Sequence, residues 1–155
     1  MKRREFIALF GGASAALPFT AHAQQSARPK HIGVLTHLAE TDAEVQGWLA
    51  AFRDRLGQLG WQEQRNIRMT SRFAAGQAEQ LPAMAKELAD LQPDVILAHA
   101  PPATEALKRA TSSIPIVFVA VSDPVGQGFV SSLARPTGNL TGLLSYEQGI
   151  VGKWL

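Results

Sequence analysis

Segments with the periodicity of β-strands and of α-helices alternate along the chain from Lys30 onward. Short apolar runs are separated by stretches in which apolar residues recur every three or four positions. This alternation is typical of a parallel sheet with helices on both faces. Because crossover connections are right-handed, the sequence predicts a doubly wound, flavodoxin-like α/β fold with strand order 2-1-3-4-5.

The strands are expected at residues 31–38, 66–73, 94–100, 114–121 and 140–145, the second of them at an edge of the sheet. For the first helix, Thr41 followed by Glu44 has the spacing of a capping box. Gly60 suits the left-handed position just after that helix. Its buried face is predicted to consist of Val45, Trp48, Leu49, Phe52, Leu56 and Leu59.

Three later helices complete the predicted pattern. The second helix of the chain has Pro82 in its opening turn and is ended by Pro93. Its buried face should consist of Leu81, Met84, Ala85, Leu88 and Leu91. A third helix is expected from about Pro102 to Thr111, and a short fourth between Gly126 and Leu133.

The N-terminus has the features of an export leader. Three basic residues precede a weakly apolar stretch, and the paired Arg3 and Arg4 followed by Phe6 favour the twin-arginine type. Ala21 and Ala23 give the small-x-small pattern of a cleavage site, so residues 1–23 are interpreted as a leader and 24–29 as a linker. We therefore expect a periplasmic protein cut after Ala23. The apolar stretch is too short for a permanent membrane anchor.

Charge and cysteine content exclude several functions. Lys2, Arg3, Arg4 and Glu5 carry a net charge of +2, which equals the formal charge of the whole chain. The remainder is about neutral, so no basic stripe for nucleic acid is present. The chain has no cysteine, which excludes disulfides and thiolate chemistry.

Polar residues at the ends of the first, third and fourth predicted strands are the candidate ligand site. In sheets of this order, ligands bind beyond the carboxyl ends of the strands near the topological switch point. The helix that opens after the third strand also directs its positive end there, which suits a carboxylate. The predicted contacts are Thr36, His37, Pro101, Ala103, Thr104, Ser122 and Asp123.

Several of these residues have a second, structural interpretation. Asp123 precedes Pro124 and is as well suited to capping the next turn as to contacting a ligand. Thr104 could cap its own helix instead of contacting a ligand. His37 and His99 fit ligand contact or simple packing better than metal binding, because no set of three or four ligands accompanies them. Tyr146 could stack on a ligand or cover the edge of the sheet.

No motif for a nucleotide or for catalysis is complete. Gly126-Gln127-Gly128 resembles the start of a dinucleotide fingerprint, but Ser131 replaces the third glycine and the motif follows the fourth strand. Asp123 lacks a paired base or carboxylate, which makes it a poor general acid or base. The sequence therefore predicts no cofactor, no metal and no catalytic group.

The chain resembles the ABC transporter substrate-binding proteins of the tryptophan/tyrosine-uptake-like type. The resemblance is carried by "HIGVLTHLAETD", "LADLQPDVILA" and above all "IPIVFVAVSDPVGQGFVSSLARPTGNLTGL" followed by "GKWL". It implies a type I periplasmic binding protein, with two α/β lobes that close on a small ligand and a membrane permease as partner. Members often carry Gly-Thr-Pro-Ala where this chain has His99-Ala100-Pro101-Pro102-Ala103. The threonine hydroxyl of those members is therefore missing here.

The resemblance also implies a particular domain organisation. Residues 30–145 correspond to the N-terminal lobe, 146–155 to the start of a further helix or crossover, and the second lobe is expected to be missing. A single lobe offers half of the ligand contacts, and its uncovered surface is expected to favour self-association. The alternative interpretations are a flavodoxin-like enzyme and a sensor or regulatory ligand-binding domain.

Overall fold

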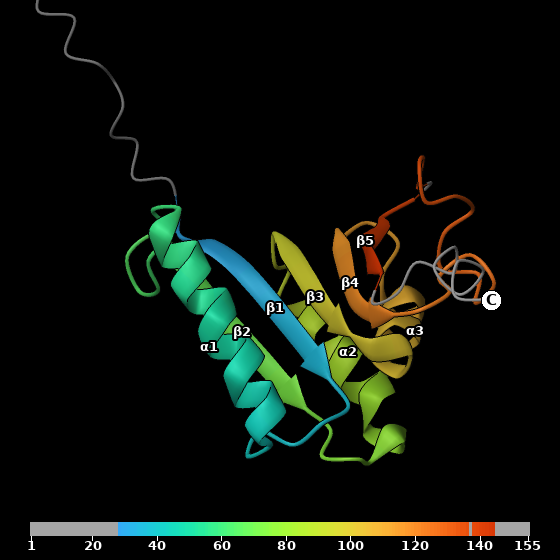
Figure 1. Ribbon diagram of the computed structural model, residues 1–155, viewed down its shortest axis with the longest axis horizontal. Helices are drawn as coiled ribbons and strands as arrows, with labels where there is room; N and C mark the ends of the chain where they lie inside the picture. Colours follow the sequence, from blue (N-terminus) through green and yellow to red (C-terminus); the bar gives the residue numbers. More distant parts are fainter. Residues whose placement is uncertain (1–27, 137, 145–155) are drawn as a thin grey trace, which may run out of the picture.

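The computed structural model describes residues 28–136 and 138–144. Its centre is one sheet of five parallel strands in the order β2-β1-β3-β4-β5, which confirms the predicted topology (Figure 1). The strands are β1 (Lys30–Thr36), β2 (Ile67–Phe73), β3 (Val95–His99), β4 (Ile116–Val121) and β5 (Leu140–Leu144). The predicted leader, most of the linker and residues 145–155, including Tyr146, lie outside the described residues.

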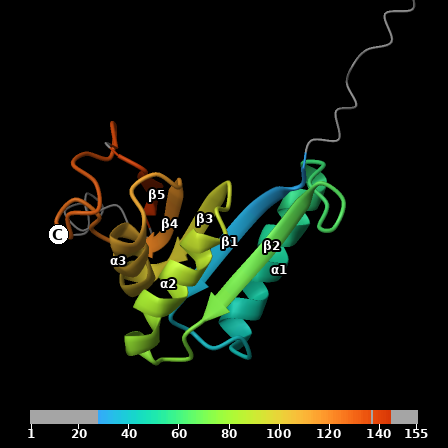
Figure 2. The same cartoon turned by 180° about the vertical axis from the view of Figure 1, so that it is seen from behind.

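Helices cover the two faces of the sheet unequally (Figures 1 and 2). Helix α1 (Ala43–Gln58) lies on one face. On the other lie α2 (Leu81–Asp90), which the 3-10 helix η1 (Ala78–Gln80) precedes, and α3 (Ala100–Ala110). None of these described helices combines the length and the apolar character needed to span a membrane.

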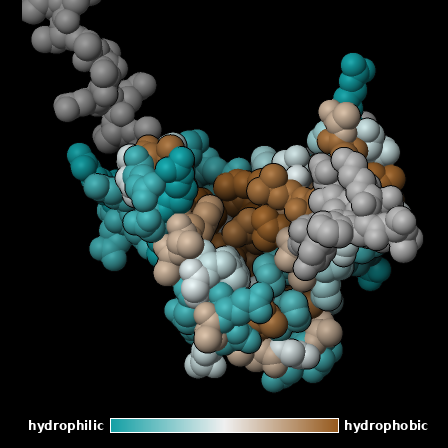
Figure 3. Space-filling view, viewed as in Figure 1, coloured by the Kyte–Doolittle hydropathy of each residue, from teal (hydrophilic) through white to brown (hydrophobic). Residues whose placement is uncertain are grey.

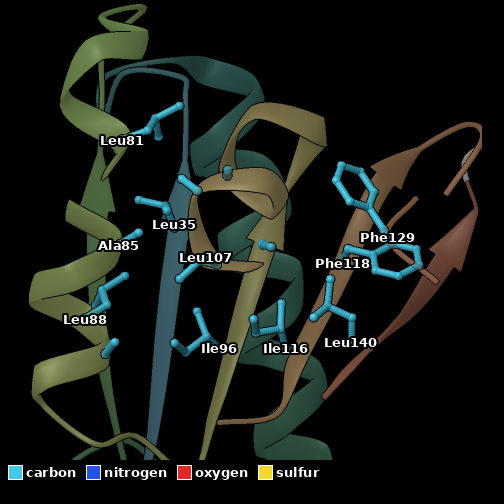
Figure 4. Packing of buried hydrophobic residues seen from close by; sticks show 14 of the residues in the cluster. Leu35, Leu81, Ala85, Leu88, Ile96, Leu107, Ile116, Phe118, Phe129 and Leu140 are labelled. Carbon is cyan, nitrogen blue, oxygen red and sulfur yellow. The ribbon is translucent and has the colours of Figure 1, made fainter. Parts of the chain in front are cut away.

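Side chains of β1, β3 and β4 alternate between two hydrophobic clusters. Val34 packs with Val45 and Leu49 of α1, whereas its neighbour Leu35 belongs to the cluster beneath α2 and α3. Burial of each large side chain contributes roughly 1.5–3 kcal/mol before ordering entropy is deducted. The clusters therefore fix which side chains each strand end presents on each face. Figure 4 shows the larger cluster, which includes Leu81, Ala85, Leu88, Ile96, Leu107, Ile116 and Phe118.

Helix α1 begins one residue later than the capping-box pattern predicts. Asp42 is the N-cap, with an extended backbone (φ −66°, ψ 127°), and its Oδ1 accepts a hydrogen bond from the Glu44 N–H at 2.8 Å. Thr41 is exposed outside the helix, so the predicted capping role of Thr41 is wrong. Both residue types are good N-caps, and the sequence pattern alone could not separate them.

Other boundaries also differ from the predictions. Leu59 and Leu91, expected in buried stripes, are 61% and 45% exposed because α1 and α2 end at Gln58 and Asp90. Helix α3 begins at Ala100, two residues earlier than expected. The segment 126–133 forms turns in place of the predicted helix, and Gly128 has a φ of +68° within it.

The C-terminus of α1 has the geometry predicted for Gly60. Gly60 has a φ of +86°, and its N–H donates to the Gly57 carbonyl at 3.0 Å. The Trp61 N–H donates to the Leu56 carbonyl at 2.9 Å. These two bonds form a Schellman motif, which requires a left-handed residue at Gly60.

Replacement of Gly60 is therefore predicted to destabilise the protein through backbone strain alone. A Cβ at Gly60 would meet no atom within 4 Å, yet a left-handed alanine costs about 1 kcal/mol. We expect Gly60→Ala to lower the free energy of unfolding, measured by urea denaturation, by about 1 kcal/mol.

Gly47→Ala is the matched control. Gly47 lies inside α1, and a Cβ there also meets nothing within 4 Å. Because alanine has the higher helix propensity, this variant should gain about 0.5–1 kcal/mol. Equal effects of the two substitutions would contradict the assigned Schellman motif.

The face of β4 and β5 on the side of α1 is open in the described part of the chain. Val117 and Val119 are only half-buried at the margin of the α1 cluster, and Leu143 is 70% exposed. Figure 3 shows hydrophobic surface gathered in a hollow beside α1. The sheet therefore carries uncovered apolar surface.

Candidate ligand-binding site

The carboxyl ends of β1, β3 and β4 lie side by side, as the predicted site requires. Thr36 at the end of β1 pairs with His99 at the end of β3, and His99 pairs with Val119 of β4. The alternation of side chains places all three on the face covered by α1. Residues far apart in the sequence therefore form one row at this edge.

Thr36 is fully buried and makes two polar contacts. Its Oγ1 lies 3.2 Å from His99 Nδ1 and accepts a hydrogen bond from the Leu38 N–H at 3.2 Å. The first contact ties the end of β1 to the end of β3. The second shapes the turn that leads from β1 toward His37.

Three aromatic rings stack at the same edge. The His99 ring lies 5.3 Å from the Trp48 ring, with 14° between their planes, and 5.9 Å from the His37 ring, with 8° between the planes. Trp48 comes from α1, His99 from β3 and His37 from the loop after β1. We call these three residues the aromatic stack.

Two nitrogens of the aromatic stack are buried without a hydrogen-bond partner among the described residues. They are Nε1 of Trp48 and Nδ1 of His37. A buried polar atom without a partner costs about 1–3 kcal/mol, so such atoms are rare away from functional sites. Burial lowers the pKa of His99, and the nearby His37 adds to this, while the carboxylate of Glu44 opposes it. The His99 ring is therefore neutral at neutral pH.

From the sequence, His37 is predicted in the site, His99 has either a ligand-contacting or a packing role, and Trp48 is expected only in the helical stripe. The position of Trp48 in its helix could have predicted its place in the site. In a parallel α/β fold, the helix after β1 begins near the carboxyl edge, so an aromatic residue in its second turn lies close to the strand ends.

The start of α3 offers fewer backbone donors than a typical helix. Pro101 and Pro102 lack an N–H, and Ala103 is fully buried. Thr104 is also fully buried, and its Oγ1 donates to the Ala100 carbonyl at 2.9 Å, within its own helix. This bond lies within the helix but is not a cap, because His99 is the N-cap of α3 and no side chain caps it, so the capping interpretation of Thr104 is wrong.

Ala100 makes a sharp, strained turn between β3 and α3. Its φ is +70°, a conformation that costs a non-glycine residue of order 1–3 kcal/mol. Strained strand-to-helix turns can carry a catalytic nucleophile, but this position holds an alanine, whose methyl group has no such chemistry. The strain serves to redirect the chain beside His99.

The loop after β4 is organised by Asp123. Its Oδ1 accepts a hydrogen bond from the Gly126 N–H at 2.8 Å, and a Cβ at Gly126 would collide with Asp123 Oδ2. The carboxylate therefore shapes the turn, as its structural interpretation predicts. Ser122 is exposed beside it. Gly126 is required by this close approach, and the glycine pair belongs to a turn instead of a dinucleotide site.

The opposite, amino edge of the sheet carries a separate cavity of about 470 Å³. It is lined in part by His31 and Arg68. The His31 ring is satisfied on both sides, with Nε2 2.9 Å from Thr70 Oγ1 and Nδ1 3.1 Å from the Arg68 guanidinium. Burial and the Arg68 charge lower the pKa of His31. None of the residues predicted for the ligand site lines this cavity.

Metal-binding side chains do not cluster in the described ranges 28–136 and 138–144. No group of three or more His, Asp or Glu side chains there could hold an ion. The donors at the carboxyl edge are imidazole, indole, hydroxyl and backbone groups. They suit the recognition of an organic ligand by hydrogen bonds and stacking.

A doubly wound α/β lobe with polar and aromatic side chains at its strand ends is the architecture of a small-molecule binding protein. The chain belongs to the family of ABC transporter substrate binding proteins, whose model matches residues 32–150. This is a family of binding proteins, not of enzymes.

Three relatives illustrate the match. The chain is 31% identical over 123 residues to a tyrosine-binding protein of Clostridioides difficile, covering 78% of this chain and 34% of that protein. The ligand-free, open structure of a substrate binding protein with adhesive properties from Clostridium difficile matches with a TM-score of 0.70 at 28% identity, covering 76% of this chain and 39% of that one. A structure from Streptococcus pneumonia in complex with L-Trp matches with a TM-score of 0.68 at 26% identity, covering 75% and 38%. The chain thus spans less than two-fifths of the length of each of these proteins.

The lowered pKa values of His31 and His99 predict a loss of stability in mild acid. Both groups titrate below the usual value of about 6.5 in the folded protein, so the unfolded chain takes up protons first. The stability that the two neutral imidazoles contribute is fully present above about pH 6.5. It is lost as the pH falls from there toward the pKa values of these groups in the folded protein. We expect the free energy of unfolding to decrease over this range.

Urea denaturation at steps between pH 8 and pH 5 measures this dependence, and an NMR titration of the imidazoles identifies the groups. The variant His99→Phe should show a smaller decrease than the unaltered protein. A folded-state pKa of His99 at or above 6.5 would contradict the burial assigned to its ring.

Proposed function

We propose that the chain is the ligand-binding lobe of an ABC transporter substrate-binding protein and that its ligand is an amino acid. The observation that carries the proposal is the cluster of polar and aromatic side chains at the carboxyl ends of three adjacent strands, in a chain of this family. A ligand at this edge would bind near the switch point between β1 and β3. It would be held by hydrogen bonds and stacking, without covalent change.

The proposed contacts are those predicted from the sequence, with roles that the geometry refines. Thr36 orients the edge through His99, and His37 contributes a ring face. Ser122 offers an exposed hydroxyl, while Asp123 acts through the turn that it holds. At the start of α3, Pro101, Ala103 and Thr104 would shape the site by their backbone more than by their side chains.

Aromatic amino acids are the first ligands to test. One relative is named for tyrosine, and the streptococcal structure contains L-Trp. A planar side chain also suits an edge where three rings stack and Val119 adds apolar surface. The proposal therefore names L-tyrosine and L-tryptophan ahead of small aliphatic amino acids.

The open face of β4 and β5 supports two further parts of the proposal. The relatives are about twice as long as this chain, and a second lobe would complete their site by closing on the ligand. Without such cover, apolar surface around Val117, Val119 and Leu143 favours self-association. A membrane permease would receive the ligand from the complete protein.

Binding is tested by titrating the ¹⁵N-labelled chain with L-tyrosine, L-tryptophan, L-alanine and L-glutamate and following the amide shifts by NMR. We expect shifts at residues 36–38, 99–104 and 122–123, strongest with the aromatic amino acids, and weak affinity because one lobe supplies half of the contacts. Shifts confined to the amino-edge cavity near Arg68 would contradict the proposed site. The absence of any response would overturn the proposed function.

Export by the twin-arginine route, with removal of residues 1–23, is the second testable part of the proposal. The pattern of Arg3, Arg4 and Phe6 supports the route, and Ala21 and Ala23 support the cleavage site. In a Gram-negative host, the protein should appear in the periplasm with Gln24 as its first residue. The double variant Arg3→Lys, Arg4→Lys should remain uncut in the cytoplasm, and export unaffected by this change would refute the twin-arginine route.

A further inference from the structure

We propose that His99 is a specificity-determining residue of the proposed site. Its neutral imidazole donates from Nε2–H to the carboxylate of the ligand, and Trp48, His37 and Thr36 hold it in place. The inference rests on the proposed binding function and deepens it, since it assigns the ligand's acid group to one atom of the protein.

Three side chains contact His99 and fix its position. The Trp48 ring lies at 5.3 Å, the His37 ring lies at 5.9 Å, and both are nearly parallel to the imidazole. Thr36 Oγ1 contacts Nδ1 at 3.2 Å. A ring that is only 8% exposed and held this way cannot turn freely. It can present one edge in a constant direction, and such preorganisation limits the entropy lost on binding.

The contacts of Thr36 assign the tautomer of His99. Thr36 is fully buried, and its Oγ1 accepts a hydrogen bond from the Leu38 N–H, so His99 Nδ1 is the acceptor available to the hydroxyl proton among the described residues. Donation to Nδ1 satisfies this buried proton, whereas a proton on Nδ1 would leave it without a partner, and the imidazole proton is therefore placed on Nε2. Nε2 has no hydrogen-bond partner among the described residues. His99 thus offers a donor at Nε2.

Further donors at this edge point to an acidic ligand group. The indole nitrogen of Trp48 can only donate, and it is buried without a partner among the described residues. Helix α3 begins directly after His99, with the positive end of its dipole at the same edge. The carboxylate of Asp123 is engaged by Gly126, and Glu44 is solvent-exposed. A cluster rich in donors is complementary to a carboxylate.

The aromatic stack also explains why a ligand whose carboxylate binds His99 would have an aromatic side chain. Val119 lies beside His99 in the sheet, and Trp48 lies over the His99 ring from α1. An amino acid with its carboxylate at Nε2 would place its side chain near these apolar surfaces. The buried indole N–H of Trp48 has no partner among the described residues, so a ligand acceptor that reached it would remove the cost of that unmet hydrogen bond.

The decisive experiment compares three forms of the whole chain, unaltered, His99→Phe and His99→Gln, in NMR titrations with L-tyrosine and with tyramine, which lacks the carboxylate. Phenylalanine retains a flat ring for the stack but has no donor, whereas the glutamine amide carries a donor close to the position of Nε2. We expect His99→Phe to weaken L-tyrosine binding about 10- to 100-fold and to leave tyramine binding within about 3-fold. His99→Gln should bind L-tyrosine more tightly than His99→Phe does.

A matched pair of tryptophan variants tests the stack. Trp48→Phe removes the orphaned indole N–H, and Trp61→Phe removes an indole N–H beyond the far end of α1, where Trp61 lines a different cavity. We expect the first variant to weaken L-tyrosine binding and the second to leave it unchanged. Equal effects of the two would overturn the assigned role of Trp48. Imidazole ¹⁵N shifts provide a separate readout, because they report a proton on Nε2 if the tautomer is as assigned.

The possible results separate the two proposals. If the unaltered chain binds neither aromatic amino acid, the proposed function fails and the role of His99 fails with it. If the unaltered chain binds L-tyrosine but His99→Phe binds it equally well, only the role of His99 is overturned. The same holds if His99→Phe weakens tyramine binding as much as L-tyrosine binding. A proton found on Nδ1 of the folded chain would also overturn it.

Discussion

The parallel pairing of β1 with both β2 and β3 is the constraint on which the rest of the structure depends. It places Thr36 directly beside His99, although 63 residues separate them in the sequence. No local interaction could bring these side chains together. The hydrogen bond between them is therefore a consequence of the topology, and the edge at which they meet is the edge where sheets of this order bind ligands.

The division of the core into two clusters decides what that edge can do. Because successive side chains in a strand point to opposite faces, burial of Leu35 beneath α2 and α3 obliges Thr36 to face α1. The same rule turns His99 toward α1, where Trp48 covers it. A shift of one residue in the register of β3 would turn His99 toward α2 and α3 and move Ala98 from that face to the face of α1. The precision of the site is thus set by hydrophobic packing away from it.

The sequence predicted the topology well and the site in part, for distinct physical reasons. Strand order follows from the alternation of periodicities and the handedness of crossovers, which need no side-chain detail. The strand ends that carry Thr36 and Ser122 follow from it. Single-residue features were harder: Asp42 and Thr41 are equally good caps, and the Asp123–Gly126 bond replaces a predicted helix with a turn. The stack of Trp48 on His99 depends on how a helix lies across a sheet, which no local pattern encodes.

The two most buried histidines of the sheet show how a structural position differs from a functional one. At the amino edge, both nitrogens of His31 have partners, Thr70 and Arg68, and its backbone N–H donates to Asp94. At the carboxyl edge, Thr36 satisfies one nitrogen of His99, and its stacking neighbours keep buried nitrogens unpaired among the described residues. Backbone strain does not distinguish the two edges, because Gln64 and Gln92 beside the amino-edge cavity have positive φ just as Ala100 and Ala120 do. A chain under selection for stability alone would satisfy both edges, so the unequal distribution of unmet hydrogen bonds indicates which edge meets a ligand.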